Sequence, residues 1–245
     1  MIDDKVMISV NDVSIRFNMA SERIDNIKEY VIKLLKRKLM FQEFIALKDV
    51  SFEVKAGESW GFVGMNGSGK STLLKTVCGI LKPFKGSVSV HGTISPLIEL
   101  GAGFDGNLTA RENIFLNGCV LGYGEKLIKE KFDEIVDFAE LKDFLDIPIK
   151  NFSSGMSARL GFAIATTVKP DILVCDEVLA VGDFKFQQKC ENRMNELLSG
   201  GTTLLFVSHS TEQVKRMCQK ALWLDHGHVK MIGNAAEVCD AYSKN

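Results

Sequence analysis

A glycine-rich loop followed by a lysine and two hydroxyl residues has the most specific chemistry in the sequence. Residues 64–72 read GMNGSGKST and match the pattern GxxxxGK[ST]. Glycines let a backbone wrap closely round a polyphosphate with its N–H groups inward, and the helix that follows adds its positive end. Lys70 is expected to reach the β- and γ-phosphates, and the Ser71 hydroxyl to bind Mg²⁺. The loop therefore predicts a nucleotide site whose phosphate-binding residues are Gly64, Asn66, Gly67, Ser68, Gly69, Lys70, Ser71 and Thr72.

Two consecutive carboxylates supply the second part of this chemistry. Asp176 and Glu177 directly follow the apolar run at 172–175. Ligands of open α/β sheets bind at the carboxyl ends of the strands, so both side chains are expected at the phosphate end of the site. Asp176 is suited to hold Mg²⁺, and Glu177 to accept a proton from an attacking water. On its own such a pair would be a solvated strand end; downstream of the glycine-rich loop it predicts hydrolysis.

The elements that must position these groups follow from hydrophobic periodicity. Residues 8–17 alternate apolar and polar side chains, which predicts a half-buried strand. Continuous apolar runs are typical of strands buried on both faces of a parallel sheet, and they occur at 60–63, 172–175 and 204–207. Further strands are expected at 52–54 and 87–90, and helices at 70–79 and 124–146. We predict one α/β domain over 1–245, with a mostly parallel core sheet, an N-terminal antiparallel β subdomain, a helical subdomain over about 105–165 and a short C-terminal helix at 233–245.

Residues 18–43 are expected to form an amphipathic helical insert. Ser21 is a suitable N-cap, acidic residues follow it, and Lys36, Arg37 and Lys38 lie in the last turn, as the helix dipole favours. Two interpretations stay open for the Ser21–Met40 helix. It packs its apolar face on the domain, or its basic end lies against anionic lipid headgroups near the membrane.

Composition narrows the functional classes. The net charge is −1 and 46% of residues are hydrophobic, which gives no indication of nucleic-acid binding. The six cysteines form no CxxC pair and no metal-ligand spacing, so they are expected to be reduced thiols that mostly fill the core. The polar start of the chain does not suggest a signal peptide, and no apolar run reaches the roughly 20 residues of a membrane span. We therefore expect any membrane-spanning part to come from another chain.

Three further segments give the sequence its family resemblance. Residues 151–156, NFSSGM, precede a helix and resemble the LSGGQ signature of ABC ATPases. Ser208 and His209 follow a strand at the position of the switch histidine, and residues 180–183, AVGD, occupy the position of the D-loop, which includes Asp183. The order of these motifs resembles ABC ATPases from about residue 8 to 232, so the predicted fold is a P-loop NTPase of the ABC cassette type.

The resemblance implies how the residues would act. Two copies would associate head to tail with ATP and Mg²⁺ between them, and Ser153, Ser154 and Gly155 would meet the γ-phosphate bound to the other copy. Lys70, Glu177 and His209 are then the catalytic residues, with Ser71 and Asp176 on the metal. Phe17 is the first choice for stacking on adenine and Phe44 the alternative.

One position departs from the common family pattern. The loop that normally carries a glutamine has Glu99 instead, within the run ELGAGF at 99–104. This run, the FSSGM signature and the insert resemble exporters of polysaccharide, O-antigen and teichoic acid. We predict the ATP-hydrolysing subunit of such an exporter, a homodimer on the cytoplasmic face of the membrane with a separate transmembrane permease and no nucleic-acid partner. The alternatives are an ABC ATPase that exports another cargo, such as a drug or lipid, and a non-transport ABC ATPase.

Overall fold

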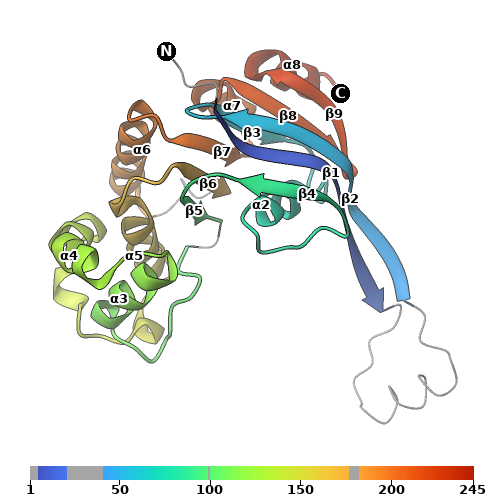
Figure 1. The fold of residues 1–245 in the computed structure, drawn as a ribbon. Coiled ribbons are helices and arrows are strands. Elements are labelled where there is room, and N and C mark those ends of the chain that lie inside the picture. The colour runs from blue at the N-terminus through green and yellow to red at the C-terminus, as the bar shows by residue number, and fades with distance from the viewer. Residues whose placement is uncertain (1–4, 21–40, 99, 177–181) are drawn as a thin grey trace, which may run out of the picture.

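Two sheets and a group of helices make up the molecule (Figure 1). The computed structural model describes residues 5–20, 41–98, 100–176 and 182–245. The larger sheet has the strand order β5-β6-β7-β3-β8-β9, and the smaller sheet the order β2-β1-β4. This division matches the predicted mostly parallel core sheet and antiparallel N-terminal subdomain.

The larger sheet is parallel except at one edge. Its parallel strands are β5 (Ile94–Leu97), β6 (Ile172–Asp176), β7 (Thr203–Val207), β3 (Ser59–Val63) and β8 (Lys220–Asp225). Strand β9 (His228–Asn234) pairs antiparallel with β8. All five residues of β3 and of β7 are buried, which explains their continuous apolar runs. The carboxyl ends of β3, β6 and β7 therefore open toward the same edge of the sheet.

The smaller sheet is a long antiparallel ribbon with one added strand. Strands β1 (Val6–Ala20) and β2 (Phe41–Lys55) pair along their length, and β4 (Lys85–Val90) pairs with β1. The far end of the ribbon projects from the body of the molecule (Figure 1). A helix over all of 18–43 is therefore wrong at both ends, because residues 18–20 pair with 41–43 as strands. The expected helix at Ser21–Met40 lies outside the described residues.

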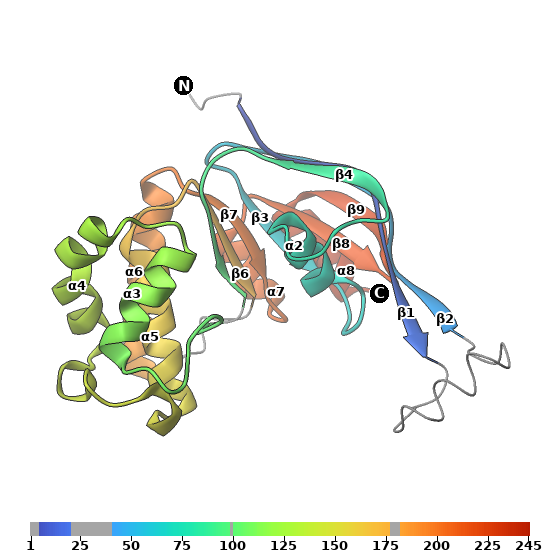
Figure 2. The same cartoon turned by 60° about the horizontal axis from the view of Figure 1, so that its bottom comes forward.

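The helices fall into three groups. Helix α2 (Lys70–Val77) lies between the two sheets (Figure 2), where Leu73, Leu74 and Val77 are buried. Helices α3 (Ala110–Val120), α4 (Glu125–Ala139) and α5 (Ser154–Thr167) gather at one side with the short 3₁₀ turns Lys142–Phe144 and Ile149–Asn151. The remaining helices are α6 (Phe184–Ser199), α7 (Thr211–Met217) and α8 (Ala235–Ser243).

The predicted helix over 124–146 is shorter than expected. Helix α4 ends at Ala139, and Glu140 takes a left-handed conformation with φ 60°. The Lys189 ammonium donates hydrogen bonds to the carbonyls of Asp137 and Phe138, at 3.2 and 2.8 Å. A cation that binds the last carbonyls stabilises a helix end at this point.

The buried hydrophobic side chains form two clusters, which correspond to the two sheets. One cluster of buried side chains joins the helical group to the larger sheet, and a second fills the space between the sheets around α2. Cys175, Cys190, Cys218 and Cys239 are buried, and burial raises the pKa of the Cys175 and Cys218 thiols. None of the described helices combines the length and apolar character needed to cross a membrane.

Candidate nucleotide site

The glycine-rich loop joins the buried strand β3 to helix α2. Gly69 stands at the N-cap of the helix with φ 108°, where a Cβ would lie 2.8 Å from the Ala46 carbonyl oxygen and 2.7 Å from Leu47 Cδ2. A side chain at this position would be strained and would also push against strand β2. Glycine therefore lets the loop and β2 approach each other, and this contact forms one wall of the site.

Lys70 is the first residue of α2 and is buried to 6% exposure. Its ammonium donates hydrogen bonds to the carbonyl oxygens of Gly64 at 2.7 Å and Met65 at 3.0 Å. These bonds hold the lysine over the loop and keep its charge beside the N-terminus of α2. Both positive groups therefore face the same small volume.

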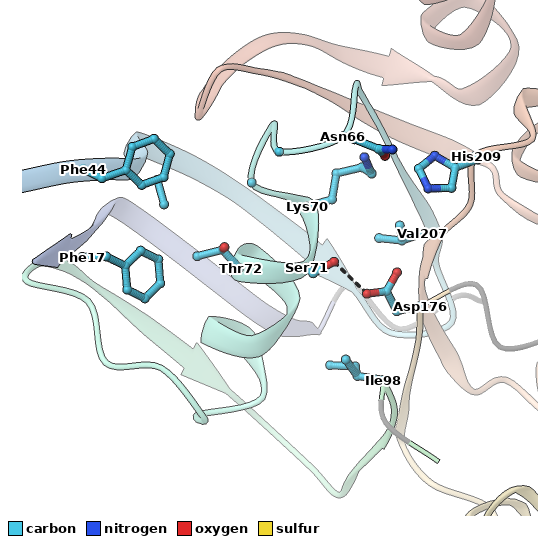
Figure 3. A pocket seen from close by; sticks show the side chains of 13 residues that line it. Phe17, Phe44, Asn66, Lys70, Ser71, Thr72, Ile98, Asp176, Val207 and His209 are labelled. Carbon is cyan, nitrogen blue, oxygen red and sulfur yellow. Dashed lines mark hydrogen bonds between the residues drawn. The ribbon is translucent and has the colours of Figure 1, made fainter. Parts of the chain in front are cut away.

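Ser71 and Asp176 meet although they are 105 residues apart in the sequence. The Ser71 hydroxyl donates a hydrogen bond of 2.8 Å to Asp176 Oδ2, drawn as a dashed line in Figure 3. Strand β7 lies between β3 and β6 in the sheet, so α2 reaches across it to the end of β6. A hydroxyl and a carboxylate at this separation offer two oxygen donors to one hard cation, which fits Mg²⁺.

A cavity of about 460 Å³ opens above the loop. Phe17 and Phe44 line one end, and Lys70, Asp176 and His209 line the other (Figure 3). The two phenylalanines are register partners in the β1–β2 ribbon and are 38% and 46% exposed. Both candidate aromatic residues therefore belong to one wall. The cavity has an aromatic end and a charged end.

His209 follows the last residue of β7 by two positions and lines the cavity. Its neighbour Ser208 is buried and donates a hydrogen bond of 2.7 Å to Gln213 Oε1. The Ser208 hydroxyl also accepts a bond from the amide of Ser210, the N-cap of α7. This local network fixes the turn that presents the histidine.

The predicted phosphate-binding residues divide into two sets. Asn66, Gly67, Gly69, Lys70, Ser71 and Thr72 line the cavity. Gly64 and Ser68 are not among its described lining residues. Ser68 is buried beneath the loop, its amide donates to the Met65 carbonyl, and its carbonyl accepts from Gly227. Its backbone is thus committed to the fold of the loop.

Three lining residues were not predicted from the sequence: Ala46, Ile98 and Val207. Ala46 lies two positions after Phe44 in β2, where the pairing with β1 shifts register, and both residues line the cavity. Nothing in the sequence indicated Ala46, because neither this shift nor the close approach of β2 to the loop can be read from residue spacing. Predicted residues Glu99 and Glu177 lie outside the described part of the chain.

The predicted signature segment lies apart from this cavity. Ser153 is the N-cap of α5, and its hydroxyl accepts a hydrogen bond of 3.2 Å from the Met156 amide. Ser153 and Ser154 are exposed, and with Gly155 they fall outside the described lining of the site. Ser153 and Gly155 instead border a second cavity of about 360 Å³. One copy of the chain therefore does not bring the signature to its own phosphate loop.

Asp183, the predicted D-loop residue, is the N-cap of α6. Its carboxylate accepts a hydrogen bond of 2.9 Å from the Phe186 amide and pairs with Arg159 at 3.0 Å. The Phe186 amide, and after it the Arg159 charge, holds the pKa of the Asp183 carboxyl below its ordinary value. An ionised aspartate at a helix N-terminus also stabilises the helix dipole.

The fold and the loop geometry define a P-loop nucleotide-binding domain. Residues 47–180 match the ABC transporter family model, and the chain belongs to this family. Its architecture resembles a dimeric ATP-binding cassette in a post-hydrolysis state bound to ADP and Pi, with a TM-score of 0.73, 22% identity and coverage of 94% of this chain and 99% of that one. The predictions of an ABC cassette fold and of an ABC ATPase are confirmed.

Curated relatives come from export systems. The chain is 44% identical over 203 residues to the O-antigen export system ATP-binding protein RfbB of Klebsiella pneumoniae. The matched region covers 83% of this chain and 82% of the relative. It is 41% identical over 239 residues to the teichoic acids export ATP-binding protein TagH of Listeria innocua. This match covers 98% of the chain and 70% of the relative. The resemblance inferred from the sequence motifs is confirmed.

Proposed function

We propose that this chain is the ATP-hydrolysing subunit of an exporter of O-antigen, teichoic acid or a similar lipid-linked polymer. Two copies would act together and drive a separate transmembrane permease from the cytoplasmic face of the membrane. The Ser71–Asp176 hydrogen bond, between the phosphate loop and the end of β6, is the observation that carries the ATPase part. The names of the relatives support the choice of cargo.

The cavity accommodates ATP in one direction. The aromatic end suits adenine, which stacks on Phe17 with Phe44 beside it. The loop amides and the Lys70 ammonium then face the phosphates, where Lys70 exchanges its two carbonyl partners for phosphate oxygens. Ser71 and Asp176 would hold Mg²⁺, which neutralises charge that develops on the transferred phosphate.

Hydrolysis requires a water that is positioned and deprotonated. His209 lies at the charged end of the cavity, and in this proposal it contacts the γ-phosphate and orients the water. Glu177 accepts the proton from that water. The assignment rests on its place in the sequence, directly after Asp176. Glu99 stands in the loop where the family normally has a glutamine, and in this proposal it takes over the role of that glutamine.

The signature must come from a second copy. Ser153, Ser154 and Gly155 form the exposed N-terminus of α5, whose amides suit an anion. They lie away from the chain's own loop, so a head-to-tail pair would complete each site with the signature of the other copy. The dimeric cassette with the same fold supports this arrangement.

A direct test of the ATPase uses one lysine in the loop and one outside it. Lys70→Ala should abolish ATP hydrolysis measured by phosphate release, because the phosphates lose their charged partner. Lys82→Ala changes an exposed lysine after α2 and should leave turnover unchanged. Equal activity of both variants would refute the assignment of the site.

The paired arrangement has its own test. Lys70→Ala and Ser153→Ala are each expected to be inactive, because each disables every site of its own homodimer. In a mixture, heterodimers carry one site with both residues intact, so activity should return. No recovery in a mixture shown to form heterodimers would argue against the arrangement in trans.

Export is tested in the producing cell. Loss of the gene should remove the polymer from the cell surface while its lipid-linked precursor accumulates inside. The wild-type chain should restore export, and the Lys70→Ala variant should not. Normal surface polymer in the deletion strain would favour another cargo. We also propose that residues 21–40, predicted from the sequence to form a basic amphipathic helix, contact the membrane surface, since Lys36, Arg37 and Lys38 lie near the end of this segment.

A further inference from the structure

Arg159 lies at the junction of three helices. It belongs to α5, and its side chain is 19% exposed. Nη1 donates a hydrogen bond of 3.1 Å to Glu140 at the end of α4, and Nη2 donates one of 3.0 Å to Asp183 at the start of α6. The guanidinium also packs over the Phe186 ring, 4.6 Å from its centroid. Each of the two terminal nitrogens thus holds a different helix end.

Arg159 and Asp183 both belong to segments that are expected to act at the nucleotide. Arg159 lies about 9 Å along the α5 axis from the N-cap Ser153, six residues at about 1.5 Å each. Asp183 caps α6 and comes shortly after the predicted base, Glu177, in the sequence. Arg159, Ser153 and Gly182 border the same second cavity of about 360 Å³. The arginine therefore connects α5, the predicted signature helix, to the start of α6, which follows Glu177 closely in the sequence.

We propose that Arg159 is a positioning residue that fixes the N-terminus of α5 relative to the N-terminus of α6. The inference rests on the proposed function, in which Ser153 serves the nucleotide of the second copy and Glu177 serves the chain's own. Arg159 thereby makes the geometry of one site depend on the placement of the signature at the other.

The chemistry of the side chain explains why an arginine is needed. A guanidinium is planar and offers separate donors in a fixed fork, whereas an ammonium is a single point of charge. A lysine at 159 would keep the charge but could not hold Glu140 and Asp183 with the same fixed geometry. The side chains of Glu140 and Asp183 are 44% and 67% exposed, so the pairs contribute little to stability. The contact acts mainly on geometry.

Arg193 provides a matched control. Its side chain is 21% exposed, its two terminal nitrogens each lie 3.0 Å from Glu134 Oε1, and it packs over the Phe138 ring at 5.1 Å. It joins α6 to α4 by the same chemistry, and among the described residues no hydrogen bond or ion pair joins it to the signature helix or to Asp183. Arg193→Lys therefore measures the structural effect of losing a guanidinium fork, and Arg159→Lys measures that effect plus the proposed positioning.

The experiment compares both variants with wild type in steady-state ATP hydrolysis and in amide hydrogen exchange. Arg159→Lys should lower kcat about tenfold with KM for ATP changed less than about twofold, and Arg193→Lys should change both less than about twofold. Exchange should become faster at residues 154–158 and 183–188 in Arg159→Lys only. Asp183→Asn keeps an N-cap but loses the charge, so adding it to Arg159→Lys should reduce kcat little further.

Equal kcat and exchange in the two lysine variants would overturn the proposal, and so would a kcat loss that follows a loss of Tm, measured by thermal unfolding of the same variants. A failure of the proposed function looks different, since wild type would then show no turnover that Lys70→Ala removes. In that case the exchange comparison still decides the role of Arg159, because it needs no hydrolysis. Unchanged exchange at 183–188 in Arg159→Lys would refute it.

Discussion

Two glycines of the phosphate loop allow backbone strain to be separated from steric contact. Gly67 and Gly69 both have positive φ, at 78° and 108°. A Cβ at Gly67 would meet nothing within 4 Å, whereas one at Gly69 would lie 2.8 Å from the Ala46 carbonyl oxygen. Alanine at either position has to adopt a left-handed conformation, but only alanine at 69 also collides with the backbone of β2.

The expected destabilisation follows from these two terms. The left-handed conformation costs an alanine about 1–2 kcal/mol, so Gly67→Ala should lower the free energy of unfolding by about that amount. Gly69→Ala carries a similar cost and must also displace strand β2. Overpacking of this kind costs a further free energy of roughly 1–3 kcal/mol. We therefore expect Gly69→Ala to be less stable than Gly67→Ala by about 2 kcal/mol.

Urea unfolding followed by circular dichroism, without nucleotide, measures both free energies. The absence of nucleotide matters because both glycines line the cavity and ligand binding would add its own stabilisation. Gly69→Ala should also weaken binding of an ATP analogue, since Ala46 lines the cavity and moves with β2. Equal unfolding free energies for the two variants would refute the reasoning that the close approach to β2 requires glycine.

Three further predictions use other parts of the structure. Phe17→Ala and Phe44→Ala should each weaken binding of a fluorescent ATP analogue, and Phe17→Ala should have the larger effect, about tenfold, from the loss of base stacking. Phe84→Ala is the control, because Phe84 is exposed and lies outside the described lining of the cavity. Equal losses of affinity in all three variants would contradict the assignment of Phe17 and Phe44 to the nucleotide site. Glu177→Gln should keep ATP binding, trap the dimer and stop hydrolysis, so near-normal turnover would exclude it as the base. The amide and hydroxyl of Thr93 lower the pKa of Asp171 below 3.8, so this carboxylate stabilises the fold above about that pH and loses its effect as the pH falls through the lowered value. Wild type should therefore exceed Asp171→Asn in unfolding free energy at pH 7 by about 0.5 kcal/mol for so exposed a group, with the gap closing in acid; a gap that widens in acid would contradict this sign.

Local sequence was sufficient for the parts of the site that depend on nearby residues. The loop from Gly64 to Thr72, the buried strand β3 before it and helix α2 after it are set by glycine content and short apolar runs. Asp176 was also predictable, because a carboxylate directly after a buried parallel strand reaches the binding edge of the sheet. Helix α4 was predicted too long, because its end depends on Lys189, a residue 49 positions beyond Glu140.

Contacts between distant residues were decided by the tertiary structure. The sequence left Phe17 and Phe44 as alternatives, but the register of β1 and β2 sets them opposite each other in one wall. Ala46 became part of the site because Gly69 lets β2 approach the loop. Arg159 showed no motif that foretold its contact with Asp183. The physical reason is common to all three: residue types and spacing determine local conformation, whereas strand register and helix packing determine which distant side chains meet.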